Sequence, residues 1–103
     1  MENLYIVIPA YNEEETISTV ARQWHQIVEN ISSDSRLVIV NDGSKDHTLE
    51  ILQKLQKQLP QLVTLSKPNG GHGPAVLYGY HYALKHNADF RQFRHLNKHC
   101  RHK

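Results

Sequence analysis

The sequence predicts an α/β protein in which helices cover both faces of a mostly parallel sheet, a three-layer α/β/α arrangement. Short runs of apolar, largely β-branched residues alternate along the chain with longer segments whose apolar residues recur every three or four positions. The short runs are typical of buried strands and the longer segments of amphipathic helices. Their regular alternation implies parallel strands joined by right-handed crossovers.

The first strand and helix give the clearest pair of elements. An apolar run at residues 4–8 predicts a buried strand, which Pro9 should end because proline cannot donate a ladder hydrogen bond. Asn12 is expected to cap the following helix, with Glu15 three positions later as its capping-box partner. The apolar positions of this helix follow a period near 3.6 residues and are Ile17, Val20, Ala21, Trp24, Ile27, Val28 and Ile31.

The second unit repeats this pattern. Residues 37–40 predict another buried strand, and leucines spaced three or four residues apart predict a helix after it. Ser44 or Asp46 is expected to cap that helix, and Pro60 to end it.

The third unit is expected to begin with a short strand at residues 62–65. A third helix should then start with Pro74 as its first residue and run to about residue 86. Residues 88–90 resemble the approach to a fourth strand.

Composition limits the kind of protein this can be. A chain of 103 residues with 39% hydrophobic residues forms one domain with a modest core. No apolar run approaches the roughly 20 residues of a membrane helix, and the N-terminus has no secretory pattern. The single cysteine excludes an internal disulfide and fits a reducing compartment. We therefore expect a cytoplasmic protein with no membrane span.

Charge is distributed unevenly along the chain. Residues 1–90 contain all ten acidic residues and seven Lys or Arg, whereas residues 91–103 contain five Lys or Arg and no acid. The sequence therefore predicts one domain over residues 1–90 and a divergent basic tail over residues 91–103. The tail shows no interleaving of aromatic and basic residues of the kind that forms a stacking platform, so no nucleic-acid partner is expected. The tail also contains four residues of types that can bind a metal, but their spacing matches no standard zinc site, so no metal site is predicted. They are His95, His99, Cys100 and His102.

Candidate binding residues follow each predicted strand, where doubly wound sheets hold their ligands. After the first strand, backbone groups around Ala10 are expected to meet a base edge, and Tyr11 offers an aromatic face. After the second strand, Asp42 offers a carboxylate to an N–H of a base or to a ribose hydroxyl, and Gly43 permits close backbone approach. The alternative for both segments is an ordinary turn.

A glycine-rich segment at residues 69–75 follows the third strand. Consecutive backbone N–H groups at a helix start can cradle a phosphate. The segment is not a Walker A loop, because no Gly-Lys-Ser or Gly-Lys-Thr follows. It also differs from the dinucleotide fingerprint, which belongs after the first strand. A flexible connector is the alternative.

Three segments, at residues 6–14, 38–48 and 69–75, together resemble the N-terminal half of a family 2 glycosyltransferase. The resemblance covers about residues 3 to 90. It implies the GT-A fold, a Rossmann-like nucleotide-diphospho-sugar domain, and transfer of a glycosyl group from a UDP- or GDP-sugar to an acceptor. The form of the glycine segment is closer to the branch that uses polyprenyl-phosphate acceptors.

The resemblance also implies which residues bind the nucleotide sugar. Asp42 is expected to hold the base, and the glycine segment to lie near the ribose and diphosphate. The implied set is Pro9, Ala10, Tyr11, Glu13, Asp42, Gly43, Ser44, Gly71, Gly73 and Ala75.

The chain departs from the family pattern after the fourth predicted strand. The family carries an Asp-x-Asp motif there, which holds Mg or Mn on the diphosphate, but no acidic residue follows Asp89. A leaving nucleoside diphosphate needs its charge neutralised, and hard cations need oxygen ligands. We therefore expect a chain truncated before this motif, by truncation or frame shift of the gene. It should contain no catalytic residue, no metal ligand and no cofactor, and be inactive alone.

Two alternatives stay open at this point. A second chain could dock on an uncovered sheet edge and supply the missing acids. The same uncovered edge predicts that the monomer is only marginally stable and self-associates. The other alternative is a non-enzymatic nucleotide-binding or basic-tailed interaction module. A response-regulator-like module is disfavoured, because the third strand ends in Leu65-Ser66-Lys67 and not in an aspartate.

Overall fold

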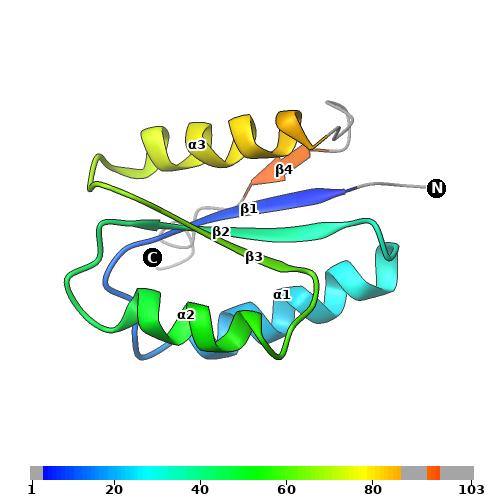
Figure 1. The fold of residues 1–103 in the computed structure, drawn as a ribbon, viewed down its shortest axis with the longest axis horizontal. Helices are drawn as coiled ribbons and strands as arrows, with labels where there is room; N and C mark the ends of the chain where they lie inside the picture. The colour runs from blue at the N-terminus through cyan, green and yellow to red at the C-terminus, as the bar shows by residue number, and fades with distance from the viewer. Residues whose placement is uncertain (1–3, 87–92, 96–103) are drawn as a thin grey trace, which may run out of the picture.

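The computed structural model describes residues 4–86 and 93–95 and confirms the α/β class. The strands form one sheet in the order β3-β2-β1-β4, and all neighbouring strands are parallel. This is the strand order of a doubly wound sheet. The elements, drawn in Figure 1, are β1 (Tyr5–Ala10), α1 (Ile17–Ile31), β2 (Arg36–Asp42), α2 (Thr48–Gln56), β3 (Leu62–Lys67), α3 (His72–Lys85) and β4 (Phe93–His95).

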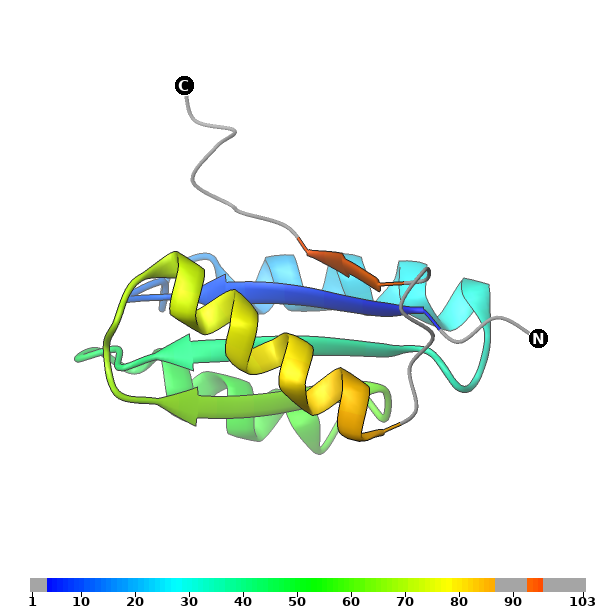
Figure 2. The same cartoon turned by 90° about the horizontal axis from the view of Figure 1, so that it is seen from above.

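Helices cover both faces of the sheet, as predicted. Helices α1 and α2 lie on one face and α3 on the other; Figure 2 shows α3 lying across the strands. Side chains of β1 alternate between the faces: Ile6 and Ile8 pack with α1 and α2, whereas Val7 packs with α3. Both faces are therefore buried, which is typical of a parallel sheet.

Helix α3 lies close to the sheet because of Gly79. A Cβ at this buried glycine would collide with the side chain of Val7 and approach Val40 to 3.3 Å. The missing side chain lets the helix backbone rest on β1 and β2. This contact fixes the position of α3 relative to the ends of those strands.

The predicted capping box at the start of α1 is wrong. The helix begins at Ile17, and Asn12 has a left-handed φ of 51°. The Asn12 side chain accepts a hydrogen bond from the backbone N–H of Lys45 instead, at 2.8 Å. A contact with the neighbouring loop has therefore replaced the local cap.

The other predicted boundaries shift by a few residues. The N-cap of α2 is His47, not Ser44 or Asp46 as predicted, and its side chain makes no capping hydrogen bond. The Oδ1 of Asp46, one residue earlier, accepts the N–H of Thr48 at 2.9 Å. That helix ends at Gln56, before Pro60, and Pro74 is the third rather than the first residue of α3. Pro9 does not end the first strand. It pairs with Val40 inside β1, beyond the three residues of β1 that pair with β4.

Strand β4 lies within the stretch predicted to be a tail. Its residues pair with β1 in parallel, with Phe93 opposite Tyr5. The approach to a strand was predicted at residues 88–90, which lie outside the described residues, as do His99, Cys100 and His102. The domain boundary at residue 90 stays a prediction.

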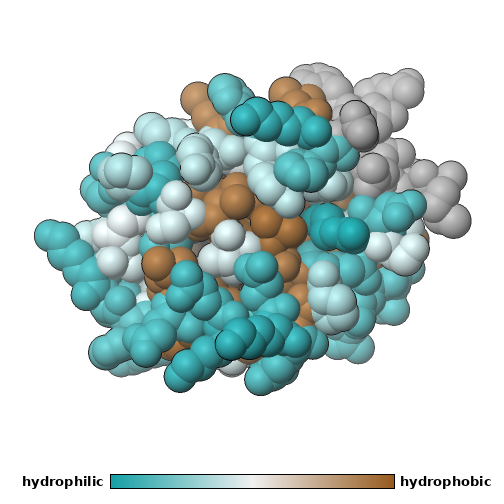
Figure 3. Space-filling model, viewed as in Figure 1, coloured by the Kyte–Doolittle hydropathy of each residue, from teal (hydrophilic) through white to brown (hydrophobic). Residues whose placement is uncertain are grey.

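The outer edge of β3 faces solvent. Figure 3 shows apolar surface between the two helical layers, where β3 runs, and Val63 and Leu65 are only partly buried. The Thr64 N–H on this strand is taken by the side-chain oxygen of Gln56, at 2.9 Å. Because this N–H already has an acceptor, it is not available to pair with an added strand at that point. Self-association through a sheet edge stays a prediction.

None of the helices within residues 4–86 has the length and apolar character needed to cross a membrane.

Candidate functional site

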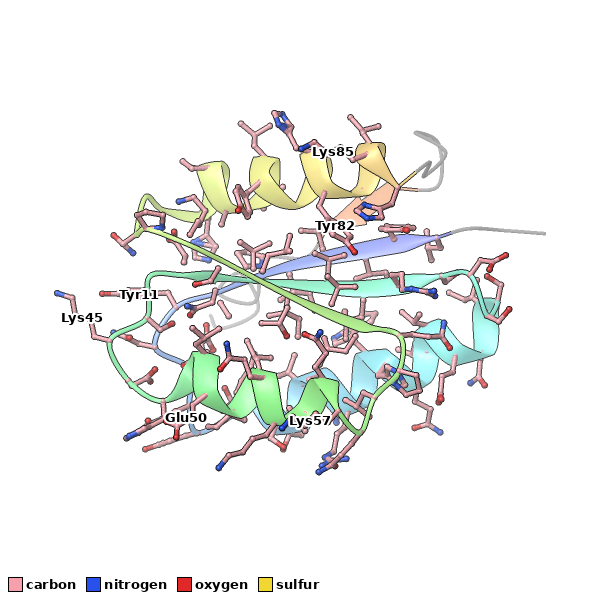
Figure 4. All side chains as sticks on the ribbon, in the orientation of Figure 1. Tyr11, Lys45, Glu50, Lys57, Tyr82 and Lys85 are labelled. Atoms are coloured by element: carbon pink, nitrogen blue, oxygen red, sulfur yellow. The ribbon has the colours of Figure 1, made fainter. Side chains whose placement is uncertain are left out.

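The segments singled out from the sequence meet at one end of the sheet. The parallel register sets Ala10 beside Asn41 and Asp42 beside Lys67, so the loops that follow β1, β2 and β3 are neighbours. Figure 4 shows Tyr11 and Lys45 at this end, the carboxyl end of the strands. The predicted convergence of Tyr11 and Asp42 at one end is therefore confirmed.

The Asp42 carboxylate is the centre of this end of the molecule. Asp42 is only 3% exposed. Its Oδ1 accepts the backbone N–H of Gly70 at 2.9 Å and the Lys67 ammonium at 3.1 Å. Its Oδ2 accepts the N–H of Gly71 at 2.9 Å and, more weakly, the Asn69 amide at 3.3 Å. One side chain thus holds four donors, all of them from residues 67–71, here called the glycine loop.

These donors set the charge of Asp42. Burial raises its pKa, but the hydrogen bonds from Gly70, Lys67 and Gly71 outweigh burial and leave the pKa below the ordinary 3.8. Asp42 is therefore ionised at neutral pH. An ionised carboxylate is the form that can accept all four donors.

The turn after β2 packs directly on the glycine loop. Gly43 has φ +66°, which residues with a side chain rarely adopt. A Cβ here would collide with the backbone N of Asn69 and lie 2.8 Å from its Cβ. Gly43 is thus required both by its backbone conformation and by the closeness of the loop, so the interpretation of residues 42–43 as an ordinary turn is incomplete.

A second set of contacts joins the loop after β1 to the loop after β2; residues 11–16 and 43–47 are here called the paired loops. The N–H of Asn12 donates to Ser44 Oγ at 2.9 Å, and Asn12 Oδ1 accepts the N–H of Lys45. The side chain of His47 lies 3.0 Å from a Glu14 carboxylate oxygen, which also accepts the His47 N–H at 2.9 Å. These contacts keep the two strand ends side by side.

Thr48, the first residue of α2, connects the paired loops through its hydroxyl group. Its buried hydroxyl donates to Asp46 Oδ1 at 2.6 Å and accepts the N–H of Glu13 at 2.8 Å. Asp46 Oδ2 accepts the N–H of Glu14 at 3.2 Å. Burial alone would raise the pKa of Asp46, but the hydrogen bonds from Thr48 and Glu14 outweigh burial and leave the pKa below 3.8.

The predicted binding residues differ in their exposure. Pro9 and Ala10 are buried within β1, and Tyr11 is partly exposed just beyond it. Glu13 and Ser44 belong to the paired loops, and their side chains engage Thr16 and Asn12. Gly71, with φ 100°, precedes α3; Gly73 is exposed and Ala75 buried in the first turns of that helix.

The carboxylates of Asp42 and Asp46 at this end are engaged by hydrogen-bond donors. No group of three or more His, Cys, Asp or Glu side chains that could hold a metal ion occurs in the part of the chain that the structure describes. Asp42 and Asp46 instead receive hydrogen bonds from backbone and side-chain donors.

Sequence reasoning gave no role at this end to the side chains of Lys67, Asn69 and Thr48, although it placed Asn69 in the glycine-rich segment. Lys67 had a usable signal, because opposite charges at the tips of adjacent predicted parallel strands lie about 5 Å apart across the sheet. Thr48 and Asn69 had none, since their contacts depend on loop conformations.

The fold and this arrangement of loops define an α/β domain of the doubly wound class whose interconnected loops lie at the carboxyl ends of the strands. Residues 5–85 match the pattern of Glycosyl transferase family 2. The chain therefore belongs to glycosyl transferase family 2, as the resemblance implied.

Individual relatives agree with this assignment. The chain is 40% identical over 79 residues to "Dolichyl-phosphate beta-glucosyltransferase ALG5C" of Trichomonas vaginalis, which covers 71% of this chain and 23% of the relative. It is 34% identical over 79 residues to "Uncharacterized glycosyltransferase YkcC" of Bacillus subtilis, covering 76% and 24%. It is 30% identical over 77 residues to "Undecaprenyl-phosphate 4-deoxy-4-formamido-L-arabinose transferase" of Pseudomonas fluorescens, covering 73% and 23%. The chain thus spans about a quarter of the length of these relatives.

Proposed function

We propose that this chain is the part of a family 2 glycosyltransferase that binds the donor, a UDP- or GDP-sugar. The observation that carries the proposal is the convergence of three loops, after β1, β2 and β3, at the carboxyl end of one parallel sheet. Sheets of this kind hold ligands beyond that end. Membership of the family supports a nucleotide-sugar as the ligand.

Each loop has a distinct part in the proposed site. Tyr11 is partly exposed at the tip of β1 and offers an aromatic face to the base. Pro9, Ala10, Glu13 and Ser44 form the neighbouring wall. The glycine loop and the start of α3, with Gly71, Gly73 and Ala75, lie next to the ribose and diphosphate, because the first N–H groups of a helix favour anions.

The acceptor in this proposal is a polyprenyl phosphate. Two of the relatives have dolichyl-phosphate or undecaprenyl-phosphate in their names, which supports a lipid phosphate as acceptor class. No acidic residue follows Asp89, so the family's Asp-x-Asp pair, which would hold Mg or Mn on the diphosphate, is not among these 103 residues. We therefore expect this chain alone to bind the donor without transferring its sugar.

Thermal unfolding with added nucleotide tests the proposal. UDP or GDP at millimolar concentration should raise the melting temperature, since a ligand that binds only the folded state stabilises it. The shift should be the same with and without Mn²⁺, and Tyr11→Ala should reduce it. Uridine and inorganic pyrophosphate, added separately, identify which half of the nucleotide is bound. Failure of both UDP and GDP to move the transition would contradict the proposal.

A further inference from the structure

We propose that the open edge of β3 is a docking site for an extended, acidic segment of another protein, which adds to the sheet as a further strand. Among the described strands, β3 pairs only with β2, so its other edge has no strand beside it. Such an edge is a template for strand addition. This surface is separate from the proposed nucleotide site, which lies beyond the carboxyl ends of the strands.

One groove runs between β3 and α2 and is mostly polar. It has a volume of about 380 Å³, and Thr64 and Ser66 line it from the strand. The residues that line it from α2 are Leu49, Gln53, Gln56 and Lys57. Most of these side chains carry hydrogen-bonding groups, so the groove suits polar or charged side chains of a partner.

A second groove, of about 260 Å³, lies on the opposite side of β3 against α3. Leu65 lines it from the strand, and the residues from α3 are Tyr78, His81, Tyr82 and Lys85. Figure 4 shows Tyr82 and Lys85 on α3 and Lys57 on α2, on either side of β3. Alternate residues of a strand face opposite sides of the sheet, so an added strand would place its side chains in the two grooves by turns.

The backbone of β3 presents hydrogen-bonding groups along the same edge. The N–H of Thr64 points away from β2, because it donates to the side chain of Gln56 at 2.9 Å. Alternate residues of a strand direct their backbone groups to the same edge, so the exposed Ser66 presents its N–H and C=O there too. In the free chain, Gln56 Oε1 takes the place of a carbonyl of an added strand. Because Gln56 is exposed, its release exchanges one hydrogen bond for another at small cost.

The charge on this side of the molecule favours an acidic partner. Residues 51–86, which include most of α2 and all of β3 and α3, contain four lysines and three histidines but no Asp or Glu. Lys67 is paired with Asp42, whereas Lys57 and Lys85 are exposed, one in each groove. Carboxylates on a docked segment would therefore meet cations and no acidic side chain in either groove.

Other occupants match these features less well. A second copy of this chain would set one basic edge against another, which places like charges together. A flat membrane surface would meet the helices on either side of β3 and not the strand backbone between them (Figure 1). An extended polypeptide uses the backbone groups and both grooves. Its expected pattern is acidic residues toward the polar groove of α2, alternating with apolar residues toward the tyrosines of α3.

Peptide binding to the 103-residue chain tests the proposal. The probe is a capped, fluorescent peptide of 6 residues, the length of β3, in which glutamate alternates with valine; fluorescence anisotropy gives its dissociation constant. A peptide with lysine in place of glutamate is the control for charge. A peptide methylated on alternate backbone nitrogens is the control for strand pairing, because it cannot donate hydrogen bonds to β3. Both controls should bind at least roughly tenfold more weakly, and about 1 M salt should weaken the acidic peptide.

Gln56→Ala gives the sharpest measurement. It frees the Thr64 N–H without changing charge, so the acidic peptide should bind roughly two- to tenfold more tightly, the contribution of one hydrogen bond. Gln53→Ala, in the same groove, is the matched control and should not tighten binding. Lys57→Glu should weaken binding roughly fivefold, whereas Lys54→Glu, which makes the same change on α2 outside the groove, should have a smaller effect.

Several results would overturn the proposal. One is an acidic peptide that binds neither wild type nor Gln56→Ala at millimolar concentration. Another is equal binding of the methylated peptide, which would show adsorption by charge without strand pairing. Dimers of the free chain that the acidic peptide does not dissociate would assign the edge to a second copy. Attachment to vesicles of phosphatidylserine and phosphatidylcholine, without peptide binding, would assign it to a membrane. None of these results bears on the nucleotide site, which UDP and GDP test separately.

Discussion

The two ends of the sheet are held together in different ways. At the carboxyl end, the ionised carboxylates of Asp42 and Asp46 bind backbone N–H groups of loops. At the amino end, side chains donate to backbone carbonyls instead: Gln61 to those of Ser32 and Ser35 at 3.0 and 2.7 Å, and the Arg36 guanidinium to that of Ser35 at 2.8 Å. The carboxyl end is therefore held by carboxylates that accept backbone N–H groups, and the amino end by side-chain donors to backbone carbonyls.

The amino end is a closed framework. The backbone N–H of Gln61 donates to Nε2 of His25, which is 3% exposed, at 3.0 Å. Ser35 Oγ accepts the N–H of Leu4 at 3.0 Å, and its hydroxyl lies 2.8 Å from that of Ser32. These bonds join the ends of α1, β1, β2 and β3 to one another. We infer that both ends contribute to stability but that only the carboxyl end sets the geometry of the proposed binding loops, and the following substitutions test that division.

Gly43→Ala should have the largest effect. A left-handed φ is unfavourable for alanine, and the new Cβ meets the backbone of Asn69, so we expect a loss of about 2–4 kcal/mol in the free energy of unfolding. Denaturant unfolding measures the loss. Gly73→Ala is the matched control: nothing lies within 4 Å of its Cβ position in α3, and helix propensity favours alanine. Equal stabilities for the two variants would show that the strand tip and the loop are not packed together.

His25→Leu should cost about 2 kcal/mol, because it leaves the buried N–H of Gln61 without its acceptor. Its effect on nucleotide affinity, measured on the folded protein, should be negligible, since His25 lies at the opposite end of the sheet. His81→Leu, at an exposed position of α3, controls for the change in residue type. Weakened nucleotide binding in His25→Leu would break the division between the two ends.

Thr48→Val should cost about 1 kcal/mol or slightly more. The two side chains have similar shapes, but valine removes the acceptor of the Glu13 N–H and one donor to Asp46. Faster amide exchange at Glu13 should accompany the loss of stability. Thr19→Val on the exposed face of α1 is the control and should be nearly neutral. Unchanged exchange at Glu13 would mean that Thr48 does not connect the paired loops.

The strands and the end of the sheet that carries the site were predictable because their signals are local. Apolar runs such as residues 37–40 leave few alternatives to a buried strand, and the parallel topology then brings the residues after β1 and β2 to one edge. Helix starts were less predictable. Asn12 has the sequence of a helix cap, but Lys45, 33 positions away, takes its side chain. A sequence pattern cannot report a competitor that only the fold brings near.

The partners of Asp42 illustrate the same limit within the site. Its position at a strand tip was predictable, but its carboxylate was expected to face a ligand. The glycine loop folds back onto it, and two glycine amides and Lys67 donate to the carboxylate. The periodicity of α1 also missed His25, which is 3% exposed, whereas the predicted apolar residues Trp24 and Ile27 are only partly buried and 42% exposed, respectively.

The pair formed by Glu14 and His47 should have the smallest effect and an opposite dependence on pH from Asp42. The hydrogen bond and charge of Glu14 raise the pKa of His47 above 6.5, so the folded protein binds this proton more tightly than the unfolded chain. The contribution of the pair is therefore fully present below about pH 6.5 and is lost as the pH rises through the folded pKa. For Asp42 the folded pKa is lowered, so its contribution is present above about pH 3.8 and is lost as the pH falls.

Unfolding of the wild-type chain and of His47→Gln at several pH values measures the first of these effects. The stability difference should be small, because His47 is exposed to solvent and its charge is screened. It should be greatest near pH 5.5 and vanish near pH 8.5, and about 1 M salt should reduce it. Glu14→Gln should remove the same pH dependence, since the raised pKa comes from that carboxylate. A difference between wild type and His47→Gln that grows toward alkaline pH would contradict the pairing, and would leave Asn12, Ser44 and Thr48 as the contacts that hold the paired loops.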